Sequence, residues 1–184
     1  IIGLLELTVT NKTFTKNDME AVQVAYESAK SLMDLIGEIL DMAKIESGEL
    51  ELAPKWTDFD ELVQPIVRVF EGLARQKNLT LYSHIDARHP DEIFIDPMRV
   101  HQVLSNLISN AIKFTEQGSI EIGMKCLRKK DQHMILELVV SDTGVGIAEE
   151  DQGQIFTPYK QSDAGKMQVG TGLGLAICMQ LVKM

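Results

Sequence analysis

Apolar residues recur along residues 18–47 with the spacing of one face of a long helix. Four of them stand seven residues apart, with further apolar side chains between them: Val22, Ala29, Ile36 and Ala43, interleaved with Tyr26, Leu32, Met33, Ile39 and Leu40. This spacing predicts an amphipathic helix with a continuous apolar seam. Thr15 with Asp18 is typical of a helix start, and Ser47-Gly48 is typical of a helix end.

The residues before Asn11 also have a helical pattern, and the polar turn Asn11-Lys12-Thr13 predicts that they fold back on the longer helix. The expected product is an antiparallel helical hairpin over residues 1–50. Two helices cannot bury such a seam between themselves, so we expect a homodimer in which two hairpins form a four-helix bundle. The alternative is that the seam packs on the rest of the same chain.

Beyond residue 50 the pattern changes to shorter elements. Residues 50–58, with Pro54 and Trp56, interrupt the helical period and predict a linker with a short extended segment, which places a domain boundary between residues 1–50 and 51–184. Helices are predicted over residues 59–76, 97–114 and 149–156 and at the end of the chain, and strands over 79–85, 93–95, 119–127 and 134–141. The expected fold class is α+β: a helical hairpin followed by a two-layer sandwich, with helices on one face of a sheet.

Composition and charge narrow the partners. The formal charge of −9 argues against a general affinity for nucleic acid or anionic lipid, whose phosphates would be repelled, so bound phosphates need local donors. No run approaches the roughly 18 apolar residues of a membrane span, and we expect no direct membrane contact by this segment. Cys126 and Cys178 lie in apolar stretches without metal-ligand spacing, which predicts small core residues.

A first candidate site lies on the predicted helix over residues 97–114. Asn106, Asn110 and Lys113 share one polar stripe, whereas Leu104, Leu107, Ala111 and Phe114 share the apolar one. An Asn carbonyl oxygen is a suitable neutral ligand for Mg²⁺, and Lys113 can place a charge on a phosphate. The alternative is an ordinary solvated helix face.

A second candidate site follows the apolar strand that ends at Asp142. Gly144 and Gly146, just before Ile147, let the backbone approach whatever the carboxylate holds, and a carboxylate can accept a hydrogen bond from the exocyclic amine of adenine. Asp-Thr-Gly after a strand also presents the acid of an aspartic protease. That function needs a second Asp-Thr-Gly and an all-strand body, whereas this chain has one such triplet and long helices. A tight turn without function is the remaining alternative.

A third candidate site is the glycine-rich run over residues 170–174, which contains Thr171, Gly172, Leu173 and Gly174 and leads into the last helix. Glycines at a helix start expose backbone N–H groups toward an anion, and phosphate is the anion that we expect to bind there. The spacing is neither the dinucleotide fingerprint nor a P-loop. The polar run between Phe156 and Gly170 is long enough to act as a lid.

Taken together and in this order, the three segments resemble the N, G1 and G2 boxes of sensor histidine kinases, within the wider ATPase group that includes gyrase. Residues 155–159 resemble the F box, and residues 43–48 resemble the end of the second dimerisation helix of hybrid sensor kinases. The resemblance implies a Bergerat ATP-binding fold that binds ATP and Mg²⁺. Asn110 would hold the metal, Lys113 would touch phosphate and Asp142 would read adenine. The full set of implied ATP-binding residues is Asn106, Asn110, Lys113, Asp142, Gly144, Gly146, Ile147, Tyr159, Thr171, Gly172, Leu173 and Gly174.

The resemblance also implies what lies outside these residues. In the family the acceptor histidine belongs to a His-Glu-x-Arg-Thr-Pro motif just before a segment like residues 1–5, and His84, His89, His101 and His133 have other contexts. We therefore expect no catalytic residue on this chain and no autophosphorylation by it. Because the family's ATP domain continues past the last helix, we expect the domain to be incomplete at its C-terminal end. The implied parent is a bacterial kinase anchored in the inner membrane, with this segment in the cytoplasm and a response-regulator receiver domain as partner.

Two other functions stay open. Hydrolytic relatives in this ATPase group carry a glutamate base where this chain has Asn106, and an amide cannot take a proton from water. This difference favours phosphotransfer to a histidine over simple ATP hydrolysis. The other alternative is a nucleotide-free module that dimerises and docks a response regulator, and nucleotide binding distinguishes it from the kinase.

Overall fold

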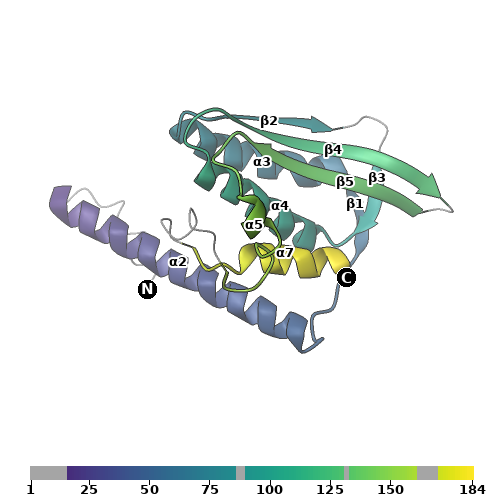
Figure 1. Cartoon of the computed structure of the whole chain (residues 1–184), viewed down its shortest axis with the longest axis horizontal. Coiled ribbons are helices and arrows are strands. Elements are labelled where there is room, and N and C mark those ends of the chain that lie inside the picture. Colours follow the sequence, from purple (N-terminus) through teal and green to yellow (C-terminus); the bar gives the residue numbers. More distant parts are fainter. Residues whose placement is uncertain (1–15, 86–89, 131–132, 161–169) are drawn as a thin grey trace. The chain divides into compact units, whose positions relative to one another are not determined.

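The structure is a computed structural model that describes residues 16–85, 90–130, 133–160 and 170–184 (Figure 1). It divides into two compact units, residues 1–50 and 51–184, which we describe separately. The predicted first arm of the hairpin and its turn lie outside the described residues. So does most of the polar run before Gly170 that we expect to act as a lid.

The first unit contains helix α2, Lys16–Glu46, which confirms the helix predicted from the apolar seam. The helix ends as its sequence predicts: Ser47 N–H donates to the Ala43 carbonyl at 3.0 Å, and Gly48 takes a φ of +71° that favours glycine. Within the described chain, much of the seam is exposed, including Leu32, Met33, Ile36, Ile39 and Leu40. The helix thus presents apolar surface that it does not bury itself.

The second unit contains two small sheets rather than the one sheet that the sequence predicted. Strand β1, Lys55–Asp58, pairs antiparallel with β3, Glu92–Ile95. Strand β4, Ser119–Lys130, lies between β2, Thr80–Ile85, to which it is parallel, and β5, His133–Asp142, to which it is antiparallel. The four-residue strands β1 and β3 pair only with each other among the described strands, and β3 runs directly into the helix that begins after Asp96.

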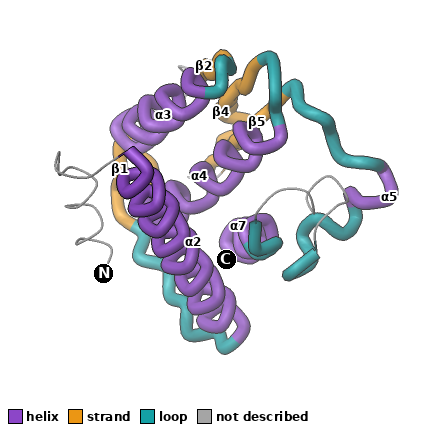
Figure 2. Tube along the Cα trace, turned by 90° about the vertical axis from the view of Figure 1, so that its left-hand side faces the viewer, coloured by secondary structure: helices purple, strands orange, loops and turns teal. Residues whose placement is uncertain are grey.

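Helices cover one face of the three-stranded sheet, as predicted (Figure 1). Helix α3, Phe59–Gln76, and helix α4, Pro97–Phe114, both have the predicted bounds and pack on this face, and Figure 2 shows the same layers from the side. Apolar side chains from both helices and from β4 fill the space between, among them Phe59, Val63, Leu104, Ile108, Ile120 and Met124. Each such burial contributes about 1.5–3 kcal/mol, so this layer fixes how α4 lies on the sheet.

The apolar face of α4 is rotated slightly from its predicted position. Leu104 and Ala111 are buried as expected, but Ile108 and Ile112 complete the buried face, and Leu107 and Phe114 are only half-buried. The reason is that both predicted residues lie on one flank of the buried stripe, given the helical spacing of 3.6 residues per turn. The polar stripe remains on the far side from the core.

The C-terminal part of the second unit is less regular. Helix α5, Glu149–Gln152, is shorter than the predicted segment 149–156, because it buries no residue and Gly153 follows it directly. Helix α7, Gly174–Lys183, ends the chain, and Cys178 on it is buried as predicted, whereas the side chain of Cys126 lies outside the described residues. Among the described helices, none has the length and apolar character needed to cross a membrane.

Asp96 connects the start of α4 to the segment that enters the second unit. Its Oδ1 accepts the N–H groups of Met98 and Arg99 at 3.0 and 3.2 Å, and its Oδ2 accepts the N–H of Ala53 at 2.9 Å. Burial raises the pKa of Asp96. The three amide hydrogen bonds and the nearby Arg99 charge lower it by more than burial raises it, so the net pKa is below its ordinary value. The ionised carboxylate is therefore part of the native structure.

We expect Asp96→Asn to lower the free energy of unfolding by about 1–3 kcal/mol at neutral pH, because the amide retains only one acceptor oxygen for three donors. A group with a lowered native pKa stabilises the fold above its unfolded pKa and loses this contribution as the pH falls through the native value. The difference between the two proteins should therefore shrink below about pH 4. Urea unfolding at neutral and acid pH measures it.

The matched control is Asp91→Asn, since Asp91 is exposed and near in sequence, and this change should leave the unfolding midpoint nearly unaltered. An Asp96→Asn deficit of the same size at acid pH would contradict the assignment of the effect to the ionised carboxylate.

Candidate functional site

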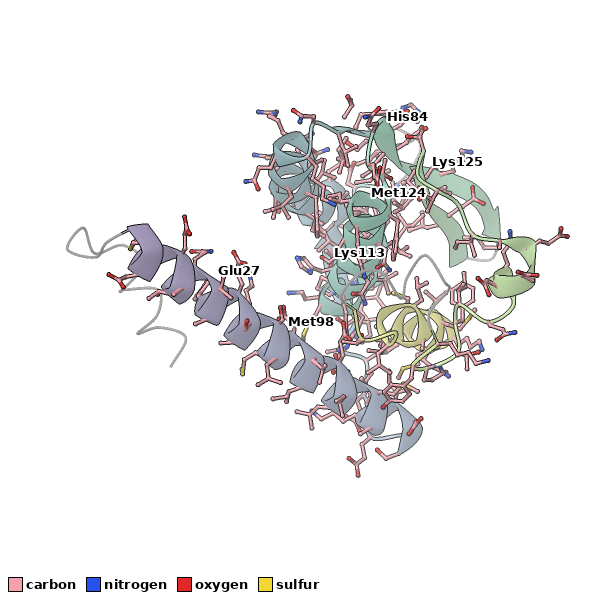
Figure 3. All side chains as sticks on the ribbon, turned by 60° about the vertical axis from the view of Figure 1, so that its left-hand side comes forward. Glu27, His84, Met98, Lys113, Met124 and Lys125 are labelled. Carbon is pink, nitrogen blue, oxygen red and sulfur yellow. The ribbon has the colours of Figure 1, made fainter. Side chains whose placement is uncertain are left out.

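The polar stripe on α4 carries an amide and an ammonium that the core does not use. Asn106, Asn110 and Lys113 are all half-buried. In the described part of the chain no group hydrogen-bonds the Asn110 amide, so its carbonyl oxygen remains available as a ligand. Lys113 extends from α4 (Figure 3) with its Nζ 4.8 Å from the centroid of the Phe114 ring, and burial lowers its pKa. Both groups can thus serve an incoming anion and its cation.

Asp142 ends strand β5, as predicted, and its carboxylate is held at one oxygen. Oδ1 accepts the Gly144 N–H at 2.8 Å and faces the Thr115 hydroxyl at 3.5 Å. Oδ2 accepts no hydrogen bond from the described residues, and the side chain as a whole is exposed. One acceptor oxygen is therefore free at a fixed position, which suits recognition of a donor such as an amine.

The turn after Asp142 packs directly on the C-terminal end of α4. Val145 N–H donates to the Phe114 carbonyl at 3.5 Å, and a Cβ at Gly144 would collide with that carbonyl oxygen. No other residue type fits there without moving the backbone, so glycine allows a close approach to α4, whereas the approach to a bound ligand that the sequence predicted stays a prediction. The first and second candidate segments are therefore in direct contact.

The glycine-rich run lies against the segment around Tyr159. Tyr159 N–H donates to the Gly172 carbonyl at 3.0 Å, and a Cβ on Gly172 would lie 3.1 Å from the Tyr159 Cα. Gly172 has a φ of +73° and Tyr159 a φ of 63°, so both residues are in the left-handed region. The predicted F-box and G2-box residues are thus neighbours through their backbones.

Asn106 joins this run to α4. Its Nδ2 donates to the Gly174 carbonyl at 3.4 Å, and a Cβ at Gly174 would lie 3.4 Å from its Oδ1. Leu173, by contrast, is a core residue at 1% exposure, and its N–H donates to the Thr171 hydroxyl at 3.1 Å. Its side chain therefore contributes to packing, and its N–H group is already paired.

Two predicted site residues have open surroundings. Gly146 has no described atom within 4 Å of the place where a Cβ would lie, and Ile147 is exposed. Thr115, in contrast, was missed by the sequence analysis although its hydroxyl reaches Asp142. The signal was present, because Thr115 ends the same helix that carries the polar stripe, but a buried hydroxyl cannot be distinguished from an exposed one by sequence alone.

The donor set fits a magnesium ion only if phosphate and water supply most of its ligands. Nowhere in the described ranges do three His, Cys, Asp or Glu side chains gather as a metal cage. Mg²⁺ usually takes one or two protein oxygens in nucleotide sites, with phosphate oxygens and waters completing the octahedron. The Asn110 carbonyl oxygen matches that limited role.

Comparison with known proteins identifies the arrangement. Residues 95–184 match the family described as histidine kinase-, DNA gyrase B-, and HSP90-like ATPase. The catalytic domain of the histidine kinase ThkA is 30% identical, with a TM-score of 0.60 over 72% of this chain and 81% of that one. The chain belongs to this ATPase family. The predicted resemblance to the ATPase core of sensor histidine kinases is confirmed, and so is the mixed α and β fold.

Two further similarities cover the whole chain. The Virulence sensor protein BvgS of Bordetella pertussis is 46% identical over 100% of this chain, which spans 15% of the length of that relative. The crystal structure of full-length ShkA in complex with AMPPNP gives a TM-score of 0.79 at 27% identity, over 100% of this chain and 37% of that chain. The chain is thus similar to part of a much longer sensor protein, and its N-terminal helix is included in the similarity.

The contact of Gly144 with α4 leads to a direct test. We expect Gly144→Ala to lower the free energy of unfolding by about 1–3 kcal/mol, because its Cβ has to displace the Phe114 carbonyl or the Asp142 carboxylate. Gly153→Ala is the matched control: nothing lies within 4 Å of its Cβ position, and its φ of −70° suits alanine. Thermal or urea unfolding of both variants compares them, and equal stability would show that the turn does not depend on this approach.

Proposed function

We propose that this chain is the ATP-binding core of a two-component sensor histidine kinase, which binds ATP together with Mg²⁺ and transfers the γ-phosphate to a histidine of its parent protein. The main support is the position of Asp142. One oxygen of its carboxylate is held and the other is free, and the turn that holds it rests on the end of the helix that carries Asn110 and Lys113. A carboxylate that can accept a hydrogen bond from adenine and side chains that can bind phosphates are thus both held at helix α4.

Each residue has a distinct role in this proposal. The free oxygen of Asp142 accepts the exocyclic amine of adenine, and Lys113 places its charge on the phosphates. Asn110 supplies the protein oxygen for Mg²⁺. The run from Thr171 to Gly174 begins helix α7, whose dipole favours phosphate at that end. By the same resemblance, Gly146, Ile147 and Tyr159 would also line the nucleotide.

Transfer to histidine is favoured over hydrolysis by the nature of Asn106. A hydrolase of this kind needs a base to take a proton from the attacking water, and an amide cannot accept one. The Asn106 Nδ2 also donates to the Gly174 carbonyl, so this side chain supports the glycine-rich run. The residues present can bind and orient ATP, whereas the nucleophile has to come from a histidine elsewhere in the parent.

The remaining partners follow from the same proposal. The exposed seam of α2, with Leu32, Ile36 and Leu40, is suited to a second copy of the chain in a four-helix bundle. The phosphate would then pass from histidine to an aspartate on a response-regulator receiver domain. We also propose that the parent is anchored in the bacterial inner membrane, with this segment on the cytoplasmic side.

Calorimetry with ADP, in the presence of Mg²⁺ and in the presence of EDTA, tests the site. We expect Asp142→Asn to weaken ADP binding about tenfold or more in both conditions, because it replaces a charged acceptor for the adenine amine. Asn110→Ala should weaken binding only with Mg²⁺ present, because it removes a metal ligand and no base contact.

The control for these variants is Ser109→Ala, an exposed change on the same helix that should leave binding unaltered. If the unsubstituted chain binds no nucleotide at millimolar concentration, the kinase proposal fails for this chain, and a nucleotide-free dimerising module becomes the better account.

The lowered pKa of Lys113 predicts a pH dependence of binding. Burial disfavours the charged ammonium, whereas bound phosphate favours it, so the pKa rises on binding. The affinity for ADP is therefore highest at pH values below the lowered pKa of the free protein, and it falls as the pH rises through that pKa. In this falling range the protein takes up a proton when ADP binds. Calorimetry in buffers of different ionisation enthalpy, between about pH 7 and 10, measures this uptake. Lys113→Arg stays charged and should bind without it, and equal proton uptake by that variant would contradict the assignment.

A further inference from the structure

Thr115 is a fully buried polar residue at the point where α4 ends. Its side chain has 0% exposure, and its N–H donates to the Ala111 carbonyl at 3.1 Å as the last bond of the helix. A buried hydroxyl without a hydrogen-bond partner is costly, so its orientation is set by the acceptors within reach. Among the described residues the acceptor that its hydroxyl reaches is Asp142 Oδ1, at 3.5 Å.

Two donors therefore converge on one carboxylate oxygen. The Gly144 N–H reaches Asp142 Oδ1 at 2.8 Å from the turn, and the Thr115 hydroxyl reaches it from the helix. The second contact is long for an O–H···O bond, and site hydrogen bonds of this kind often shorten when the ligand is bound. With Oδ1 held from two directions, the plane of the carboxylate is fixed and Oδ2 is left as the acceptor for a ligand.

We propose that Thr115 is a positioning residue that sets the preference of the site for 6-aminopurine over 6-oxopurine nucleotides. The inference rests on the proposed function and deepens it. The exocyclic amine of adenine donates to Oδ2, whereas the 6-oxo group of hypoxanthine places an acceptor against an acceptor. If the carboxylate cannot rotate, the repulsion between Oδ2 and the 6-oxo group is not relieved and weakens binding. The selectivity for adenine over hypoxanthine therefore depends on Thr115, which holds the carboxylate.

The same contact connects base reading to phosphate binding. Thr115 follows directly on Phe114, whose carbonyl accepts the Val145 N–H, and Lys113 lies over the Phe114 ring. The carboxylate that reads the base is thereby held to the last turn of the helix that carries the phosphate-binding ammonium. Because Thr115 acts through Asp142, its removal should affect binding of adenine nucleotides without removing a nucleotide contact of its own.

The test compares ATP with ITP, which differ at the 6-position of the purine and in the adjacent N1 proton. Binding of each to the full chain is measured by calorimetry for the unsubstituted protein, Thr115→Val and Thr115→Ser. Valine is nearly isosteric but lacks the hydroxyl, whereas serine keeps the hydroxyl and loses only a methyl group. We expect Thr115→Val to weaken ATP binding about fivefold and to leave ITP binding unchanged, with Thr115→Ser retaining most of the ATP preference.

Each outcome has a definite meaning. An unchanged ratio of ATP to ITP affinity in Thr115→Val overturns the inference, whether both affinities stay the same or both fall together. Thr115→Ser binding like Thr115→Val would overturn it as well, because the methyl group would then be responsible. If the valine variant does not fold, Thr115→Ala and Thr115→Ser make the same comparison, since they differ by the hydroxyl alone. Failure of the unsubstituted chain to bind ATP overturns the proposed function and this inference with it, whereas binding without a Thr115 effect overturns the inference alone.

Discussion

The structure of the candidate site depends on one close approach, that of the turn after Asp142 to the end of α4. A glycine without a side chain lets the backbone of this turn reach the Phe114 carbonyl, and the same turn holds the Asp142 carboxylate. The hydrophobic layer beneath fixes the position of α4 on the sheet, and the approach transfers that fixed position to the strand end. The core packing therefore sets the positions of the polar groups on α4 and at the end of β5, and the loops contribute less to these positions.

A second close approach occurs in the glycine-rich run. Gly174 lies against the side chain of Asn106, and Gly172 lies against the backbone of Tyr159. At Gly172 the missing Cβ and the positive φ allow the close approach to Tyr159, whereas a Cβ at Gly174 would make only ordinary van der Waals contact with Asn106. Gly172 thus does more than allow a turn, because it lets the glycine-rich run lie close to the segment around Tyr159. Such nearness is what a multiply charged ligand requires, since several weak donors have to converge on it.

Most of the fold could be predicted from the sequence because periodicity and capping are local. Helices α3 and α4 have the expected bounds, and Asp96 with Pro97 marks the start of α4 as expected. The error at α5 is also local, since a four-residue helix before Gly153 has no buried face to extend it. By contrast, the contact of Asn106 with Gly174 and the burial of Thr115 depend on how separate elements pack. Residue types identified the candidate chemistry, but only the packing shows which of those residues meet.

The parallel pairing of β2 with β4 has a consequence for how the site holds together over time. Thr80 pairs with Ser119, and the chain between these residues contains β3 and all of α4. The helix with the polar stripe thus lies in the crossover between two paired strands, and unwinding it would expose Leu104 and Ile108, which it buries in the core. Its central amides should exchange with solvent water only through openings that approach global unfolding, whereas those of α5, which buries nothing, exchange through small local openings. The least mobile part of the domain is thereby the part that carries Asn110 and Lys113, the groups proposed to hold Mg²⁺ and phosphate.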